Sequence, residues 1–274
     1  MSLSKLNRRS INRWLSVKGL LSVCLLVIFA CQNVHAQFNY PGGLIELLID
    51  KKSKELPQVR YGTREPIIIE YPNRWQILVG LSLETLPGDY LVYIKRATED
   101  SRAFSLTFKV DQKNYPVLSV NRTKKDVYIK HEKLSDLDYR NTGQPALPLR
   151  YPIQGEWSKS FGHVLNTNDD EVVQQNLISI RITQIGTVVA PHNAIVSRIE
   201  TNEFDVSSIF LDHGRGLYSI INGITDLSVE TGNGVVAGAV LGKSPYYEGR
   251  ASYVSWQCVM NGVYINPVIL AELP

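Results

Sequence analysis

Short hydrophobic runs separated by turn-forming residues recur along most of this chain. In residues 104–110, four apolar side chains alternate with polar ones, and this period of two places one apolar face of a strand on a core. Strands divided by Pro and Gly turns, without a long helical pattern, are typical of a β-sandwich. We therefore predict a sandwich over residues 37–120, with further strands in residues 66–69, 75–83 and 90–94.

The last part of the chain, residues 151–274, has a similar pattern. Its runs are short, rich in β-branched residues and bounded by Gly, Pro or Asn, which predicts a second all-β domain. The runs are residues 186–189, 194–199, 208–211, 217–221 and 235–241.

Residues 121–150 form a polar connector between these two parts. Lysines alternate there with acidic residues, which is typical of a solvated surface, and the sequence NTGQPALP at residues 141–148 predicts a loop.

Residues 1–36 have the order of a secretory signal peptide. Basic residues precede an apolar run at residues 19–30, and Val34-His35-Ala36 forms a small-residue cleavage pattern before Gln37. The apolar run is short for a membrane span. We predict export to the periplasm with a mature chain that begins near Gln37. The alternatives are a retained anchor and a lipoprotein cleaved before Cys31, and a lipid on Cys31 would attach the protein to a membrane.

Removal of this segment changes the charge and the cysteine content. Five of the 29 basic side chains lie in it, which leaves 24 basic against 26 acidic side chains. A nearly neutral chain without a basic tract excludes a nucleic-acid partner. Cys24 and Cys31 also lie in the segment. The remaining Cys258 cannot form an internal disulfide, and its apolar surroundings predict a buried thiol.

Four segments in a fixed order resemble the β-sheet core of the M23 (LytM-type, duplicated hybrid motif) zinc peptidases. They are SFG at residues 160–162, GTVVAP at 186–191, LDHGRGLY at 211–218 and WQCVMNGVYINP at 256–267. The resemblance covers residues 152–272 and implies a small open β-barrel. YPGG at residues 40–43 and PGDY at 87–90 look like the immunoglobulin-like domain found ahead of some exported M23 domains.

Active members of this family bind zinc through a His, an Asp four residues later, and the second His of a His-x-His motif. Further histidines act on the zinc-bound water, which is the nucleophile. The resemblance places Tyr253 and Ser255 at the His-x-His motif. It places Gly223, beside Asn222, at a further histidine. The first motif falls on Gln175 and Ser179 or, in a register shifted by one residue, on Asn176 and Ile180.

None of these positions carries an imidazole or a carboxylate. The histidines that follow the signal, which are His131, His163, His192 and His213, form no His-x-His, His-x-x-x-Asp or His-Glu-x-x-His motif. We therefore predict a pseudopeptidase with no catalytic residues, no zinc and no other cofactor.

Degenerate LytM-type proteins are known as a class that activates amidases or organises cell-wall remodelling. The resemblance therefore implies a non-catalytic envelope protein that binds peptidoglycan or a cell-wall amidase or other hydrolase. Four aromatic side chains are predicted to line its binding groove or, alternatively, to fill the space of the lost metal site: Tyr246, Tyr247, Tyr253 and Trp256. The alternatives for function are an active M23-type peptidoglycan metalloendopeptidase with an atypical site and a purely structural envelope protein.

Overall fold

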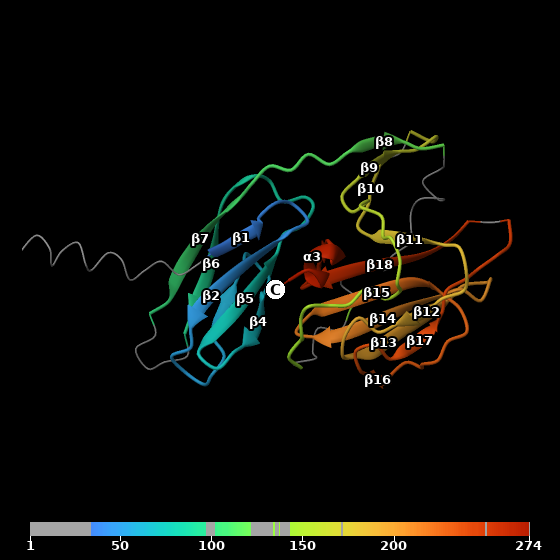
Figure 1. Cartoon of the computed structure of the whole chain (residues 1–274). Coiled ribbons are helices and arrows are strands. Elements are labelled where there is room, and N and C mark those ends of the chain that lie inside the picture. The colour runs from blue at the N-terminus through green and yellow to red at the C-terminus, as the bar shows by residue number, and fades with distance from the viewer. Residues whose placement is uncertain are drawn as a thin grey trace, which may run out of the picture. The chain divides into compact units, whose positions relative to one another are not determined.

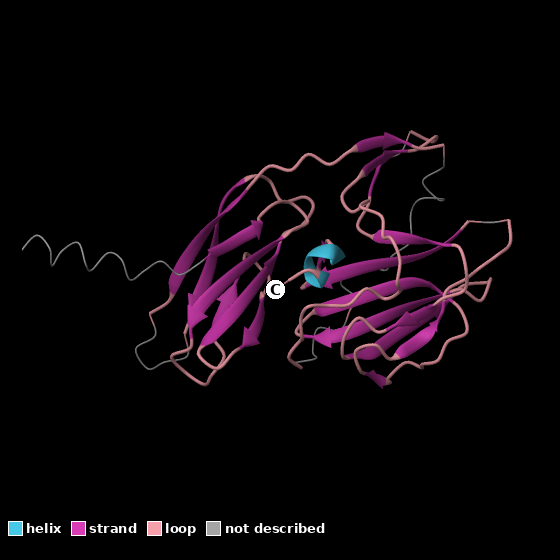
Figure 2. Cartoon of the chain, in the orientation of Figure 1, coloured by secondary structure: helices cyan, strands magenta, loops and turns pink. Residues whose placement is uncertain are grey.

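The computed structural model describes residues 34–96, 102–121, 134, 137, 143–170, 172–249 and 251–273 (Figure 1). Strands dominate these residues, and α3 (Pro267–Ala271) is the one α-helix among them (Figure 2). The expectation of an all-β fold is therefore confirmed. Within the described ranges, no helix has both the length and the apolar character that crossing a bilayer requires.

The predicted signal peptide, including Cys31, lies outside the described residues apart from its last three positions. Most of the predicted connector also lies outside them. Its described end, residues 143–150, contains neither helix nor strand.

The N-terminal sandwich consists of two antiparallel sheets, with strand orders β1-β2-β5-β4 and β3-β6-β7. Side chains from both sheets meet in a shared core, including Ile77 of β5, Ile94 of β6 and Phe108 of β7. Ser105, Thr107 and Lys109 of β7 point outward, as the alternation predicts. The strands are β1 (Val34–Phe38), β2 (Leu44–Asp50), β3 (Gln58–Arg60), β4 (Ile67–Glu70), β5 (Arg74–Gly80), β6 (Gly88–Lys95) and β7 (Phe104–Val110).

The C-terminal part is built on a seven-stranded sheet with the order β11-β18-β15-β14-β13-β16, and β19 pairs with β18. Strands β12 and β17 form a separate pair, and β8, β9 and β10 form a small third sheet. All of these sheets are open. The strands are β8 (Val117–Ser119), β9 (Val164–Asn166), β10 (Val172–Gln174), β11 (Ile178–Ile182), β12 (Thr187–Val189), β13 (Ala194–Thr201), β14 (Ser207–Gly214), β15 (Leu217–Ile224), β16 (Gly234–Val235), β17 (Val240–Lys243), β18 (Ser252–Met260) and β19 (Val263–Ile265).

One strand prediction in this part is wrong. Residues 235–241 do not form a single strand, because β16 ends at Val235 and β17 begins at Val240. A turn separates them, in which the Ala239 amide donates to the Val236 carbonyl at 2.9 Å and Gly238 has a φ of 82°. Glycine adopts this left-handed conformation at little cost, so the chain reverses here within an apolar segment.

The two faces of the seven-stranded sheet are covered differently, as β18 shows. Val254, Trp256 and Cys258 belong to the main core, which also contains side chains of α3. Gln257 and Val259 point to the other face, where Val259 packs in a smaller cluster with Leu137. Because both faces are covered, residues 254–260 are all buried. This second face carries the candidate site.

Residues 34–274 form one compact unit, and the main core extends into the N-terminal sandwich. Leu44 and Leu78 belong to this core together with Ile265 of β19. A Cβ atom added to Gly80 would lie 2.9 Å from the Ile265 Cδ1 atom, so glycine permits a close approach of β5 and β19. The Asn266 amide also donates to the Gly42 carbonyl at 3.1 Å.

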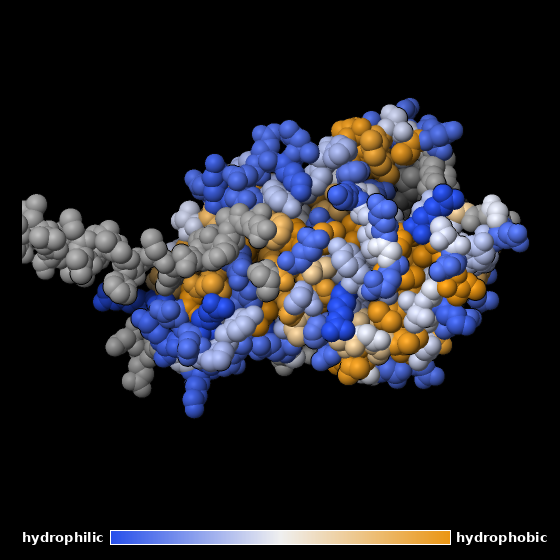
Figure 3. Space-filling view, viewed as in Figure 1, coloured by the Kyte–Doolittle hydropathy of each residue, from blue (hydrophilic) through white to orange (hydrophobic). Residues whose placement is uncertain are grey.

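The small sheet β8-β9-β10 exposes apolar side chains (Figure 3). Val117 and Val172 are more than half exposed, and Leu118 is also exposed.

Candidate functional site

Polar side chains from four neighbouring strands form one row on the second face of the seven-stranded sheet. Ser208 of β14 pairs with Asn222 of β15, Asn222 pairs with Ser255 of β18, and Ser255 pairs with Ser179 of β11. Residues paired across antiparallel strands project to the same face. The polar row, as we call these four residues, therefore brings together Ser179 and Ser255, two of the positions singled out in the sequence.

Hydrogen bonds connect three members of the polar row, and the fourth, Ser179, bonds to Ser158. The Ser208 hydroxyl donates to Asn222 Oδ1 at 2.7 Å, and Asn222 Nδ2 donates to Ser255 Oγ at 3.1 Å. At the other end, the Ser158 and Ser179 hydroxyl oxygens lie 3.4 Å apart, and the Ser179 amide donates to Ser158 Oγ at 2.9 Å. Ser158 Oγ is also 2.8 Å from Ser160 Oγ. The polar groups thus satisfy much of their hydrogen-bonding capacity among themselves.

The polar row is electrically neutral and partly shielded from solvent. Ser255 is buried, whereas Ser179, Ser208 and Asn222 are partly buried. Hydroxyl and amide oxygens are weak neutral ligands compared with imidazole, thiolate or carboxylate. No group of three or more His, Cys, Asp or Glu side chains that could hold a metal occurs among the described residues.

Gly223 adjoins the polar row but adds no side chain to it. Its φ of 85° is left-handed, and the pairing of β14 with β15 passes over it between Asn222 and Ile224. A Cβ atom at this position would lie 2.3 Å from the Tyr253 carbonyl oxygen. The side chain that joins the polar row is therefore that of Asn222, and a substitution at Gly223 would require the backbone to move.

The two registers considered for the first motif place their residues differently. In one register, Ser179 lies in the polar row, while the Gln175 backbone is tied to the loop before β9, with the Gly162 amide donating to the Gln175 carbonyl at 2.6 Å. In the other register, Asn176 Oδ1 accepts from Gln257 Nε2 at 2.8 Å, while Ile180 is buried in the main core. Only the first register contributes a member to the polar row.

The prediction that Trp256 lines a binding groove is wrong. Its side chain is 0 % exposed, and its ring lies against Tyr151 and Trp157 with centroid distances of 5.8 Å and 6.2 Å. The cause is the alternation along β18: Ser255 points to the polar row, so Trp256 must point to the main core. Tyr246 and Tyr247, in the loop before β18, and Tyr253 in β18 itself are exposed.

Two residues beside the polar row extend its surface. Tyr253 lies two positions before Ser255 on β18, and its partner on β11 is Arg181, which lies two positions after Ser179. Both side chains are exposed and share the face of the polar row. Sequence reasoning missed Arg181, and the only signal was its position two residues after Ser179.

His213 belongs to the opposite face of the sheet and is fully enclosed. Its Nδ1 atom donates to the Asn193 carbonyl at 2.9 Å, so Nε2 accepts from the Ser219 hydroxyl at 2.8 Å. Burial lowers the pKa of His213 to about 4, although the Asn193 carbonyl acts in the opposite direction. Cys258, paired with Ser219 across β15 and β18, is also buried, and burial raises the pKa of its thiol. These residues are part of the core.

No family model and no curated protein matches the chain. Solved structures do match it. A structure described as peptidase M23 from Pseudomonas aeruginosa has a TM-score of 0.62 and 23 % sequence identity, over 85 % of this chain and 95 % of that chain. A zinc-containing peptidase from Vibrio cholerae has a TM-score of 0.37 and 10 % identity, over 84 % and 57 % of the two chains. A complex of SpoIIIAH and SpoIIQ has a TM-score of 0.33 and 20 % identity, over 46 % and 98 %. The first of these likenesses shows that this chain has an M23 peptidase fold.

Proposed function

We propose that this chain is a non-catalytic, M23-like protein of the cell envelope that binds peptidoglycan or a peptidoglycan hydrolase. The observation that carries the proposal is the polar row. It contains Ser179 and Ser255, at positions where the resemblance implies zinc ligands, and Ser208, Asn222 and Ser255 are linked by hydrogen bonds.

The chemistry of the polar row argues against a metal-bound nucleophile. A catalytic zinc needs deprotonated nitrogen, sulfur or carboxylate ligands and one open position for water. Ser179, Asn222 and Ser255 offer neutral oxygen and nitrogen atoms, and those of Asn222 already have partners at 2.7 Å and 3.1 Å. Gly223 has no side chain to act on a zinc-bound water.

The surface beside the polar row supports binding. Tyr253 offers a large, rigid contact area, and the Arg181 guanidinium beside it can bind a carboxylate. Peptidoglycan stem peptides and protein partners both carry carboxylates and amides. A substrate-like ligand could therefore lie along β11 and β18 without being cleaved.

Binding and catalysis are tested together on the purified mature chain. We expect it to co-sediment with intact peptidoglycan sacculi, or to change the rate of a purified cell-wall amidase, and to release no cleaved stem peptides. Metal analysis without a chelator should find no stoichiometric zinc. Stoichiometric zinc together with stem-peptide release would establish the active-peptidase alternative. Failure in both the sacculus and the amidase assay would leave a structural role.

The surface used for binding is tested with a matched pair of tyrosine variants. Tyr253→Ala should weaken binding, because it removes an exposed ring next to the polar row. Tyr93→Ala should not, because Tyr93 is similarly exposed but lies on β6 of the sandwich. Equal loss of binding in both variants would place the contact surface elsewhere.

A further inference from the structure

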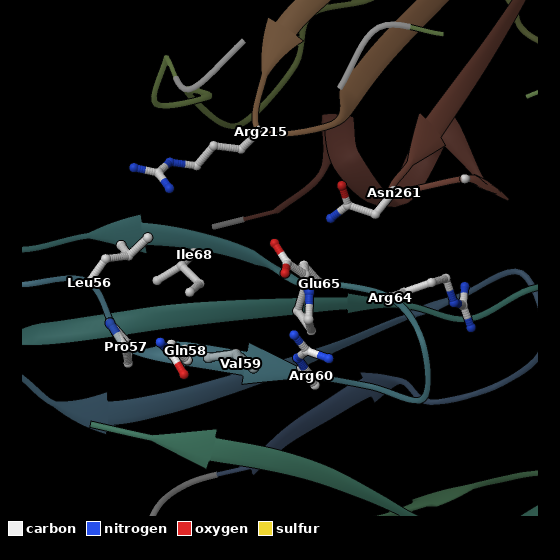
Figure 4. A pocket seen from close by; sticks show the side chains of 12 residues that line it. Leu56, Pro57, Gln58, Val59, Arg60, Arg64, Glu65, Ile68, Arg215 and Asn261 are labelled. Carbon is white, nitrogen blue, oxygen red and sulfur yellow. The ribbon is translucent and has the colours of Figure 1, made fainter. Parts of the chain in front are cut away.

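A cavity of about 620 Å³ lies beside the turn that joins β14 to β15 (Figure 4). The polar row lies at the other end of this hairpin. On one side the cavity is lined by Arg215, Asn261 and Gly262, and on the other by sandwich residues 56–68, which include β3 and part of β4. Its volume is within the usual range for a small ligand or the end of a peptide.

The ionisable side chains that line this cavity are mostly basic. Arg60, Arg64 and Arg215 contribute three positive charges against the single negative charge of Glu65. Leu56 and Ile68 add an apolar wall. Figure 4 shows Arg215 on one side of the cavity and Arg60 on the other, with Glu65 reaching between them. This composition suits a molecule with both an anionic group and an apolar part.

Arg215 occupies a backbone position that does not favour arginine. It has a φ of 50° and precedes Gly216 with a φ of 81°, so both residues of this two-residue turn are left-handed. Such hairpin turns strongly prefer Asn-Gly. The neighbouring β18–β19 turn has that pair, with a φ of 47° for Asn261 and 81° for Gly262, and the Asn261 amide donates to the Gly216 carbonyl at 2.9 Å. Turn formation therefore does not account for the arginine.

The Arg215 side chain also has a buried polar atom that is unpaired among the described residues. Its Nε atom is buried and has no hydrogen bond within the described part of the chain. Buried donors are almost always paired, so an unpaired guanidinium nitrogen calls for an acceptor. Strained backbone positions also cluster at active sites and ligand-binding sites.

We propose that this cavity binds an organic anion, consisting of a carboxylate or phosphate group on an apolar body. Arg215 and Arg60 bind the anionic group, because a guanidinium matches the planar geometry of these oxygen pairs. Arg64, which lies over the Tyr61 ring at 5.1 Å, mainly adds positive charge. Leu56 and Ile68 contact the apolar body. The C-terminus of a peptide and a phosphomonoester share this chemistry.

Titration calorimetry on the mature chain tests this site with three probes: N-acetyl-leucine, phenyl phosphate and the neutral N-acetyl-leucinamide. We expect at least one anion to bind in the millimolar range or tighter, and the neutral amide to bind at least tenfold more weakly. The tighter anion identifies the source, a peptide C-terminus or a phosphomonoester. Binding of the amide as tightly as the anions, or no binding of either anion, would overturn the proposal.

Variants locate the site. Arg215→Asn introduces a residue that the turn favours, so the protein should still fold. The affinity for the anion should fall at least tenfold, because a guanidinium is lost. Glu65→Gln removes a repelling charge and should raise affinity several-fold. Arg102→Asn removes an exposed positive charge that does not line the cavity, and should change affinity less than twofold. Unchanged affinity in Arg215→Asn would refute the assignment. Sacculus binding at the polar row is a separate readout, so either proposal can fail alone.

Discussion

Ser179 and Ser255 are directly paired across β11 and β18, with both side chains on the face opposite the main core. The sequence placed them at two different motifs 76 positions apart in the chain, and the sheet makes them neighbours. Where the resemblance implies an Asp–His pair around a metal, this chain has two hydroxyl groups. The two hydroxyl groups therefore lie side by side within the regular antiparallel pairing of β11 with β18.

Histidine at Gly223 should destabilise the protein without restoring a metal site. The left-handed backbone opposes any side chain there, and a Cβ atom would lie only 2.3 Å from the Tyr253 carbonyl oxygen. We expect Gly223→His to lower the free energy of unfolding by about 2 kcal/mol. Asn222→His, on the adjacent residue with an ordinary backbone, is the control and should cost less. Denaturant titration measures both, and tight zinc binding by either variant would contradict the expectation.

Arg215→Asn should stabilise the protein. Asparagine tolerates the left-handed conformation better than arginine, so we expect a gain of about 1 kcal/mol, or about 2–4 °C in Tm. The reciprocal change, Asn261→Arg in the neighbouring turn, should lower stability by a similar amount. Differential scanning calorimetry in a buffer without carboxylate or phosphate provides the test. A lower Tm for Arg215→Asn would show that the arginine stabilises the turn.

His213 should make the protein sensitive to acid. Its pKa falls from 6.5 in the unfolded chain to about 4 in the fold, so the unfolded state binds more protons between these values. Stability should therefore be full above pH 6.5 and decrease as pH falls toward 4, by about 3 kcal/mol in total. Burial also lowers the pKa of His192, which adds an effect of the same sign.

Urea denaturation between pH 7 and pH 4 measures the contribution of His213. His213→Gln should be less stable at neutral pH but should lose less stability on acidification. His163→Gln, at a partly exposed position in a loop, is the control for replacing a histidine by glutamine. An identical slope in His213→Gln would assign the acid sensitivity to other groups.

Substitutions of Trp256 and Tyr253 should distinguish an effect on stability from an effect on binding. Trp256→Ala removes a fully buried indole and should cost about 3–5 kcal/mol of stability. Tyr253→Ala removes an exposed ring and should change stability by less than about 0.5 kcal/mol. Thermal melting combined with sacculus co-sedimentation distinguishes them. A Tyr253→Ala variant that unfolds as readily as Trp256→Ala would mean that Tyr253 is structural.

Export remains a prediction from residues 1–36. Mass spectrometry of the native protein should find an N-terminus near Gln37. An intact Met1 would contradict export, and a lipidated Cys31 would replace the predicted cleavage site.

Alternating strands such as β7 could be predicted from sequence, because one face is buried and the other is solvated. The direction in which the Trp256 side chain points could not be predicted. Strand β18 is covered on both faces, so its buried residues do not alternate with exposed ones. The turn between β16 and β17 was missed for a related reason: Val236 and Ala237 are apolar residues within a turn.

The candidate site could also be predicted only in part from the sequence. Ser255 and Ser179 could be placed by counting within motifs. The contribution of Asn222 in place of Gly223 depends on a left-handed residue that the strand pairing skips, and no local sequence pattern specifies which of two adjacent residues will face the row.

The conformation of Gly223 also limits how this protein can be engineered. A protein engineer who wished to place a side chain at Gly223 itself would first have to move the main chain away from the Tyr253 carbonyl. Successive single substitutions at the row would each leave that obstacle in place. A histidine at Gly223 would therefore need a reshaped strand, whereas a histidine in place of Asn222 would face the polar row from the present backbone.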